Sequence, residues 1–296
     1  MRDFIIITDS CSDLSREYIN EKGIPFVCLT CRIDDKEYPD DFGESLPYKK
    51  FYDYMRAGII PKTSQPNSND YYKEFKKAAE KDLSIIYICA SSGLSGSINS
   101  AHIAKNMIRD EYEDIQIYIF DALTASLGQG LMVMKAVELK EKGMSFPDIV
   151  DYLETNVQRL NTFMIVNDLN HLKRGGRISS TAAAVGKVLN INPLLSISNL
   201  GKVLTLAKIR GRKKAVNKLG EILLERIESP KKQIISICHG DCLQEALDLK
   251  AMILSKIKVK DVYMNFIGPV VGTYGGPGAM AVFFMGKDRK HPIIEN

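Results

Sequence analysis

The chain has 296 residues, of which 45% are hydrophobic and 26% are charged, a composition that predicts a globular protein of one or two domains. The net charge of +4 is small and the densest basic run is "GRKK" at 211–214, so no nucleic-acid partner is indicated. The first apolar run is short, no window is long enough to span a bilayer, and the six Cys are scattered, so we expect no signal peptide, no integral membrane segment and a cytoplasmic location.

The first 160 residues alternate apolar runs with amphipathic runs. Such alternation predicts βαβ units and a Rossmann-like, mostly parallel sheet in an α/β domain. Ser12 or Asp13 is expected to cap the first helix, and a loop is expected over 59–70. The expected strands are 4–8, 24–33, 83–90 and 115–121, and the expected helices are 14–22, 48–58, 71–82, 98–112, 126–142 and 147–160.

The pattern changes near residue 160, where hairpin signals begin to mix with helices. "NLGK" at 199–202 is a turn signal between two apolar runs, which predicts an antiparallel hairpin of 193–198 with 203–209. We therefore expect two domains, an α/β domain over 1–160 and an α+β two-layer domain over 161–296. The other expected elements are helices at 179–189, 212–227 and 243–257, and strands at 162–168, 233–240, 262–268 and 279–286.

Two loops rich in hydroxyl groups precede helices in the first half: "KTSQPNSND" at 62–70 and "SSGLSGS" at 91–97. In an open α/β sheet, ligands bind at the carboxyl ends of the strands, where helix N-termini and hydroxyls suit an anion or a carboxylate. A serine hydrolase using Ser95 is an alternative, but Gly96 follows Ser95 directly, so the nucleophile-elbow pattern fails. A binder of another anionic metabolite is a second alternative.

Other motifs argue against a cofactor or a metal. In "AVGKV" at 184–188, Val188 stands where a phosphate-binding loop needs a hydroxyl. On a strand, Cys28 and Cys31 of "CLTC" would point to opposite faces, and "CHGDC" at 238–242 is tighter than usual zinc spacings. We therefore expect incidental cysteines, no metal and no cofactor.

Six segments together carry a resemblance that covers nearly the whole chain. The chain resembles the DegV family, bacterial proteins that bind a long-chain fatty acid such as palmitate in a buried tunnel. The resemblance implies lipid transport or fatty-acid metabolism without a catalytic centre, and for some members presentation of the acid to a fatty acid kinase. It also implies that the first domain carries the carboxylate-binding loops and that the second closes over the acyl chain. The segments are "TDSCSD" (8–13), "KTSQP" (62–66), "SSGLSGSINSA" (91–101), "HLKRGGRIS" (171–179), "AKIRGRKKA" (207–215) and "GTYGGPGAMAVFF" (272–284).

The resemblance also implies site residues. Thr63 of "KTSQP" and Ser95 of "GLSGS" should hydrogen-bond the carboxylate, and Arg177 of "GGR" should support the head-group network. The family often has His in the last segment, where this chain has Tyr274, which can donate a hydrogen bond but adds no positive charge. Acyl-chain length, saturation, tunnel-lining residues and oligomeric state do not follow from the resemblance.

Overall fold

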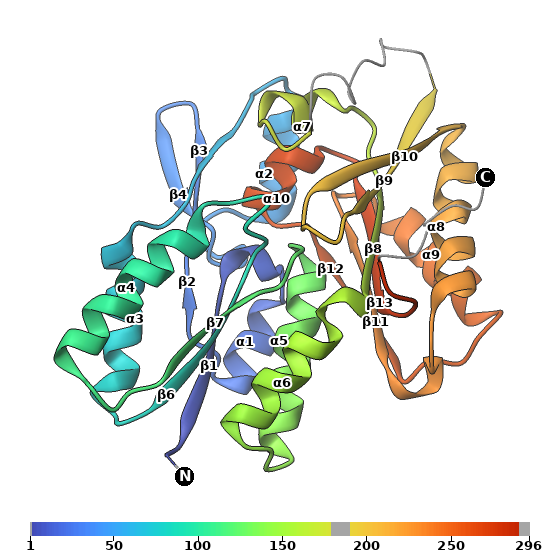
Figure 1. Cartoon of the computed structure of the whole chain (residues 1–296). Helices are drawn as coiled ribbons and strands as arrows, with labels where there is room; N and C mark the ends of the chain where they lie inside the picture. The colour runs from blue at the N-terminus through green and yellow to red at the C-terminus, as the bar shows by residue number, and fades with distance from the viewer. Residues whose placement is uncertain (1, 179–189, 290–296) are drawn as a thin grey trace.

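Two main sheets and the helices packed around them organise the chain (Figure 1). The computed structural model describes residues 2–178 and 190–289, so the helix expected at 179–189 lies outside the described residues. None of the helices described is long and apolar enough to cross a membrane.

The N-terminal sheet has four strands in the order β2-β1-β6-β7, and every pairing is parallel. All six residues of β6 are buried, as expected for a central strand covered on both faces. The predicted α/β class and parallel sheet are confirmed. The strands are β1 (Phe4–Asp9), β2 (Phe26–Val27), β6 (Ser84–Cys89) and β7 (Ile117–Asp121), and the helices are α1 (Arg16–Lys22), α3 (Ser68–Ala79), α4 (Ser97–Glu111), α5 (Leu127–Glu141) and α6 (Phe146–Asn156).

A small antiparallel sheet, which was not predicted, interrupts this half. Its order is β4-β3-β5, with β3 (Thr30–Ile33), β4 (Lys36–Pro39) and β5 (Lys62–Ser64), and α2 (Tyr48–Arg56) lies between β4 and β5 in the chain. The prediction of one strand over 24–33 is wrong, because Leu29 donates its amide to Ser10 Oγ at 2.9 Å and accepts from the Asp40 amide at 2.8 Å. The predicted loop over 59–70 contains β5 and the first residues of α3.

The predicted cap of the first helix is also wrong. Residues Ser10–Ser12 form a short 3₁₀ helix, and α1 begins only after Ser15, whose hydroxyl accepts from the Tyr18 amide at 3.2 Å. Asp13 has a left-handed backbone conformation, with φ 51°, and its carboxylate is used elsewhere. The helix predicted over 147–160 ends at Asn156 and is followed by a 3₁₀ turn, Val157–Arg159.

The C-terminal sheet is mixed and has six strands in the order β10-β9-β8-β13-β11-β12. Among the strands described in this sheet, only β11 and β12 pair in parallel, and the predicted hairpin of β9 with β10 is confirmed. The short helices α7 (Asn170–Arg174) and α10 (Pro269–Gly275) were not predicted. The strands are β8 (Leu160–Ile165), β9 (Ile191–Ile197), β10 (Val203–Arg210), β11 (Ile234–His239), β12 (Asp261–Phe266) and β13 (Met280–Met285), and the longer helices are α8 (Arg212–Arg226) and α9 (Leu243–Leu254).

Helix α5 lies between the two sheets (Figure 1). It contacts β1 and β6 on one side and β11 and β13 on the other, while α8 and α9 cover the far face of the C-terminal sheet. Ten of its fifteen residues are buried, and the charged residues that reach solvent, such as Lys135, Glu138 and Glu141, lie in its C-terminal half. The halves of the chain therefore share one hydrophobic core on the two sides of α5.

Candidate ligand cavity

A cavity of about 410 Å³ lies where the carboxyl ends of the N-terminal strands meet the inner face of the C-terminal sheet. Its volume is within the range of small-molecule sites. Both halves of the chain contribute to the wall, and most wall residues are apolar. The apolar wall includes Leu29, Ala90, Leu94 and Ala125 from the first half, and Met164, Val166, Leu172, Ile197, Val203, Ile267, Val270, Val271, Ala279, Ala281 and Phe283 from the second.

One end of this cavity is polar, and the four residues expected from the sequence lie in its wall. Thr63 Oγ1 and the Tyr274 hydroxyl share a hydrogen bond of 2.5 Å. The Arg177 guanidinium stacks on the Tyr274 ring, 4.4 Å from its centroid, and donates from Nε to the Leu94 carbonyl at 3.0 Å. Four segments that are distant in the sequence therefore meet at one point of the cavity wall.

Ser95 lies in the same wall and has different hydrogen-bond partners. Its hydroxyl shares a 2.7 Å hydrogen bond with Ser97 Oγ and accepts from the Ser97 amide at 3.2 Å, at the start of α4. Within the described ranges, no histidine or carboxylate bonds to Ser95 Oγ: the described histidines contact Arg174 or Phe266, or are exposed on α4. The arrangement supplies hydroxyl donors and no base of a serine hydrolase.

The serine-rich loop also has a structural role. Ser91 donates its hydroxyl to the Gly201 carbonyl at 2.9 Å, at the tip of the β9–β10 hairpin. A Cβ atom on Gly93 would lie 2.8 Å from the Leu200 and Gly201 carbonyl oxygens, so only glycine permits this approach. The loop therefore carries Ser95 and at the same time fixes the hairpin over the cavity.

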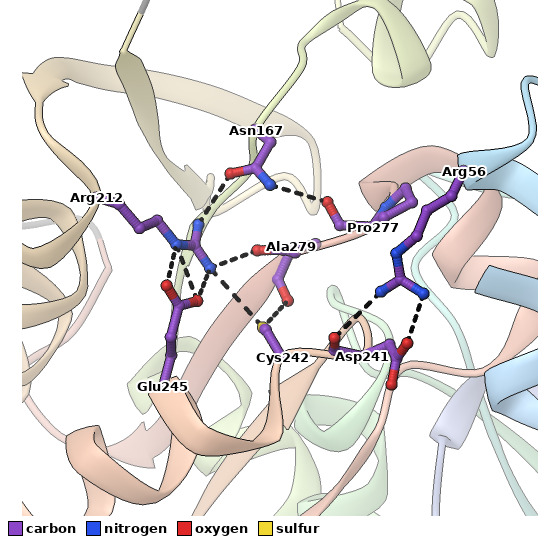
Figure 2. A network of polar contacts seen from close by, with 9 residues as sticks. Arg56, Asn167, Arg212, Asp241, Cys242, Glu245, Pro277 and Ala279 are labelled. Atoms are coloured by element: carbon purple, nitrogen blue, oxygen red, sulfur yellow. Dashed lines mark hydrogen bonds and ion pairs between the residues drawn. The ribbon is translucent and has the colours of Figure 1, made fainter. Parts of the chain in front are cut away.

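A network around Arg212 holds the Gly-rich segment that connects Tyr274 to β13 (Figure 2). Arg212 pairs with both oxygens of Glu245, donates to Asn167 Oδ1 at 3.2 Å, and donates to the Gly278 carbonyl at 2.6 Å. Asn167 in turn donates to the Pro277 carbonyl at 3.1 Å. A bidentate guanidinium–carboxylate pair is rigid, so Arg212 fixes the backbone that follows Tyr274.

Two carboxylates that sequence reasoning missed bind the backbone at the beginning of α10, the helix that carries Tyr274. Asp13 accepts from the Gly268 amide at 2.9 Å and from the Ser126 hydroxyl, and Asp40 accepts from the Val270 amide at 3.2 Å. Both side chains are almost fully buried. The available signal for Asp13 was the "TDSCSD" segment at the end of a buried strand, whereas no motif singled out Asp40.

Burial changes the acidity of these carboxyl groups. It raises the pKa of Asp13 to about 7, although the hydrogen bonds from Ser126 and Gly268 act in the opposite direction. It also raises the pKa of Asp40 well above its ordinary value, with a further contribution from the charge of Asp13. Burial also raises the pKa of Asp9, which accepts hydrogen bonds from Tyr87 and Gln129. A carboxyl with a raised pKa retains its proton to higher pH.

The sulfur and metal chemistry of the described residues is limited. All six cysteines are free thiols, and burial raises the pKa of Cys242 to about 11, so this thiol resists ionisation. Within residues 2–178 and 190–289, no group of three or more His, Cys, Asp or Glu residues is placed to hold a metal ion.

The fold and the cavity together define an α/β protein with two main sheets and, between them, a largely apolar cavity whose wall contains the cluster of Thr63, Arg177 and Tyr274. A family model described as "Uncharacterised protein, DegV family" matches residues 3–287. A DegV domain-containing protein of Clostridium perfringens is 42% identical over 292 residues, which are 99% of this chain and 100% of that protein. The chain belongs to the DegV family, which confirms the resemblance found in its sequence.

Solved structures of related proteins have the same fold. A DegV family protein from Thermus thermophilus, described by its fatty acid binding, has a TM-score of 0.87 and 28% identity, covering 97% of this chain and 100% of that chain. A stearic-acid-binding protein from Eubacterium ventriosum has a TM-score of 0.85 and 26% identity, covering 95% of this chain and 98% of that chain.

Proposed function

We propose that this protein binds a long-chain fatty acid, such as palmitate, in the cavity between its two sheets. The observation that carries the proposal is the form of the cavity, a largely apolar space in which Thr63, Tyr274 and the Arg177 guanidinium come together at one end, with Ser95 in the same wall. An amphipathic acid with one charged end suits such a space. The fatty acids bound by the relatives from Thermus thermophilus and Eubacterium ventriosum support the same ligand class.

In this proposal the carboxylate binds between Thr63 and Ser95. Both hydroxyls can rotate to donate to it, and each now bonds to another hydroxyl that can give way, Tyr274 or Ser97. Arg177 supplies the positive charge nearby and holds the Tyr274 ring in place. Tyr274 adds a donor in the position where the family often has His.

The acyl chain accounts for most of the affinity. A sixteen-carbon acid buries about fourteen methylenes at roughly 0.8 kcal/mol each, or about 11 kcal/mol before costs. Association costs about 4–15 kcal/mol, and a hydrogen bond to a charged group contributes about 1.5–3 kcal/mol. The polar end therefore orients the acid and offsets the desolvation of its carboxylate, while the tail drives binding.

The proposal extends to the roles of the two halves and to the cell. Residues 1–160 form the domain with the carboxylate-binding loops, and residues 161–296 form the domain that closes over the acyl chain. The protein carries its ligand in the cytoplasm, a reducing compartment that the free thiols suit. It has no catalytic activity of its own and serves lipid transport or fatty-acid metabolism, presenting the acid to a fatty acid kinase.

Native mass spectrometry of freshly purified protein tests the proposal. We expect a non-covalent adduct with the mass of a long-chain fatty acid, lost on delipidation and restored by added palmitate. A bound mass of a different anionic metabolite, with no uptake of palmitate, would overturn it. A covalent adduct of Ser95 with a fluorophosphonate probe, together with ester turnover that Ser95→Ala abolishes, would instead support the hydrolase alternative.

A further inference from the structure

The inner face of β13 has a steep change in side-chain size. Side chains alternate along a strand, and Ala281 and Phe283, with Ala279 just before the strand, pack toward α5 and the cavity. Val282 and Phe284 point the other way, into the core beneath α8 and α9. Passing from the Tyr274 end, the cavity side therefore presents alanine, alanine and then phenylalanine.

The cavity wall stops at this phenylalanine. On β13 the last residue in the wall is Phe283, and on β8 the first is its direct partner Thr162. The next residues on the same face, Met285 and Leu160, do not line the cavity in the part of the chain that the structure describes. The inner end of the cavity is therefore the row that contains Phe283.

The Phe283 ring reaches across to α5. A Cβ atom on Gly128, in the first turn of α5, would lie 2.8 Å from Phe283 Cδ1 and 2.8 Å from Thr124 Cγ2. The missing side chain at Gly128 thus makes room for the ring, which is 1% exposed. Phe283 fills the space between the sheet and α5, whereas Ala281, one step nearer the polar end, leaves that space open.

We propose that Phe283 is the end wall of the acyl-chain cavity and sets the longest straight chain that the protein accepts. The inference rests on the proposed function, in which the carboxylate binds at the Thr63 and Tyr274 end. The chain then runs over Ala279 and Ala281 and its methyl end meets the Phe283 ring. Because two residues of a strand span roughly 7 Å, bulk placed at Ala281 instead would shorten the cavity by about that length.

The experiment measures affinity for a series of straight-chain saturated acids, from lauric to arachidic acid, by titration calorimetry on delipidated protein. Phe283→Leu should move the preferred acid to a longer chain, with about a fourfold gain in affinity for each further methylene that enters the new space. Ala281→Leu should move the preference to a shorter chain. Phe284→Leu is the matched control, since it makes the same change one residue away on the opposite face.

The outcomes separate this inference from the proposed function. If the parent protein binds none of the acids, both are overturned. If the parent binds with a length preference that Phe283→Leu and Ala281→Leu leave unchanged, only the end wall is overturned. If Phe284→Leu moves the preferred chain length as much as Phe283→Leu does, the end wall is also overturned, because looser packing of β13 as a whole would then explain the result. Should Phe283→Leu fail to fold, Ala281→Leu decides the question. If Ala281→Leu does not prefer a shorter acid than the parent does, the proposal that Phe283 is the end wall is overturned.

Discussion

Replacing Gly175 with Ala would displace Tyr274 without touching the polar end of the cavity itself. Gly175 has φ −76° and ψ −8°, a conformation that alanine adopts readily. A Cβ atom there, however, would overlap two atoms of the Tyr274 ring. The ring must then move away from Thr63 and from the Arg177 guanidinium, which it now contacts.

The size of the effect follows from the contacts that Tyr274 loses. A hydrogen bond to a charged carboxylate is worth about 1.5–3 kcal/mol, which corresponds to about 10- to 100-fold in affinity. We therefore expect Gly175→Ala to weaken palmitate binding by about that factor in a calorimetric titration. The free energy of unfolding, measured with urea, should change little because the backbone accepts alanine.

The neighbouring glycine is a matched control with the opposite expectation. Gly176 has φ +70°, and a Cβ atom on it would have no neighbour within 4 Å. Gly176→Ala should lower the free energy of unfolding by about 1–2 kcal/mol through backbone strain and leave palmitate affinity unchanged. If Gly175→Ala binds palmitate as tightly as the parent, the position of Tyr274 does not matter for the head group and the reasoning fails.

Three further predictions concern the polar end and the carboxylates behind it. Thr63→Ala and Ser95→Ala should each weaken palmitate binding by about 1–3 kcal/mol in calorimetry at unchanged unfolding free energy, and parent-like affinity in both would refute the head-group assignment. Tyr274→Phe keeps the stack on Arg177 but loses the hydroxyl, so its affinity should fall by no more than that of Gly175→Ala; a larger loss would contradict this order. Asp13 has a pKa of about 7 in the folded state and an ordinary value of 3.8, so its contribution to stability is complete below about pH 4 and is lost as the pH rises through 7. Urea unfolding should therefore show Asp13→Asn gaining stability relative to the parent between pH 5 and pH 8, and parallel pH profiles would count against this.

The sequence predicted the parts of the fold that have strong, long periodic signals. The buried run of β6 and the Gly-containing turn between β9 and β10 are local patterns that tertiary contacts do not override. The small sheet of β3, β4 and β5 escaped prediction because strands of three or four residues carry too little periodicity. Its course depends on contacts such as that of Leu29 with Ser10, which no local pattern encodes.

The candidate site was predictable only at its polar end. Thr63, Ser95, Arg177 and Tyr274 lie in recognisable segments, and all four line the cavity. Asp13 was expected to cap the first helix, but its carboxylate binds an amide 255 residues away, at the start of α10. Apolar wall residues such as Ala281 are of the same types as the residues of the dry core. Only the three-dimensional structure therefore distinguishes the cavity wall from the core.

Helix α5 has a consequence for how a ligand enters and leaves. Because it is packed against β1 and β6 on one side and β11 and β13 on the other, moving the two sheets apart would expose apolar surface on a helix of which ten of fifteen residues are buried. A hinge motion that separates the two main sheets is therefore unfavourable. Under the proposed function, a fatty acid would then enter and leave without separation of the two sheets, so the size of the opening beside α10 and the β9–β10 hairpin would limit the rate of exchange.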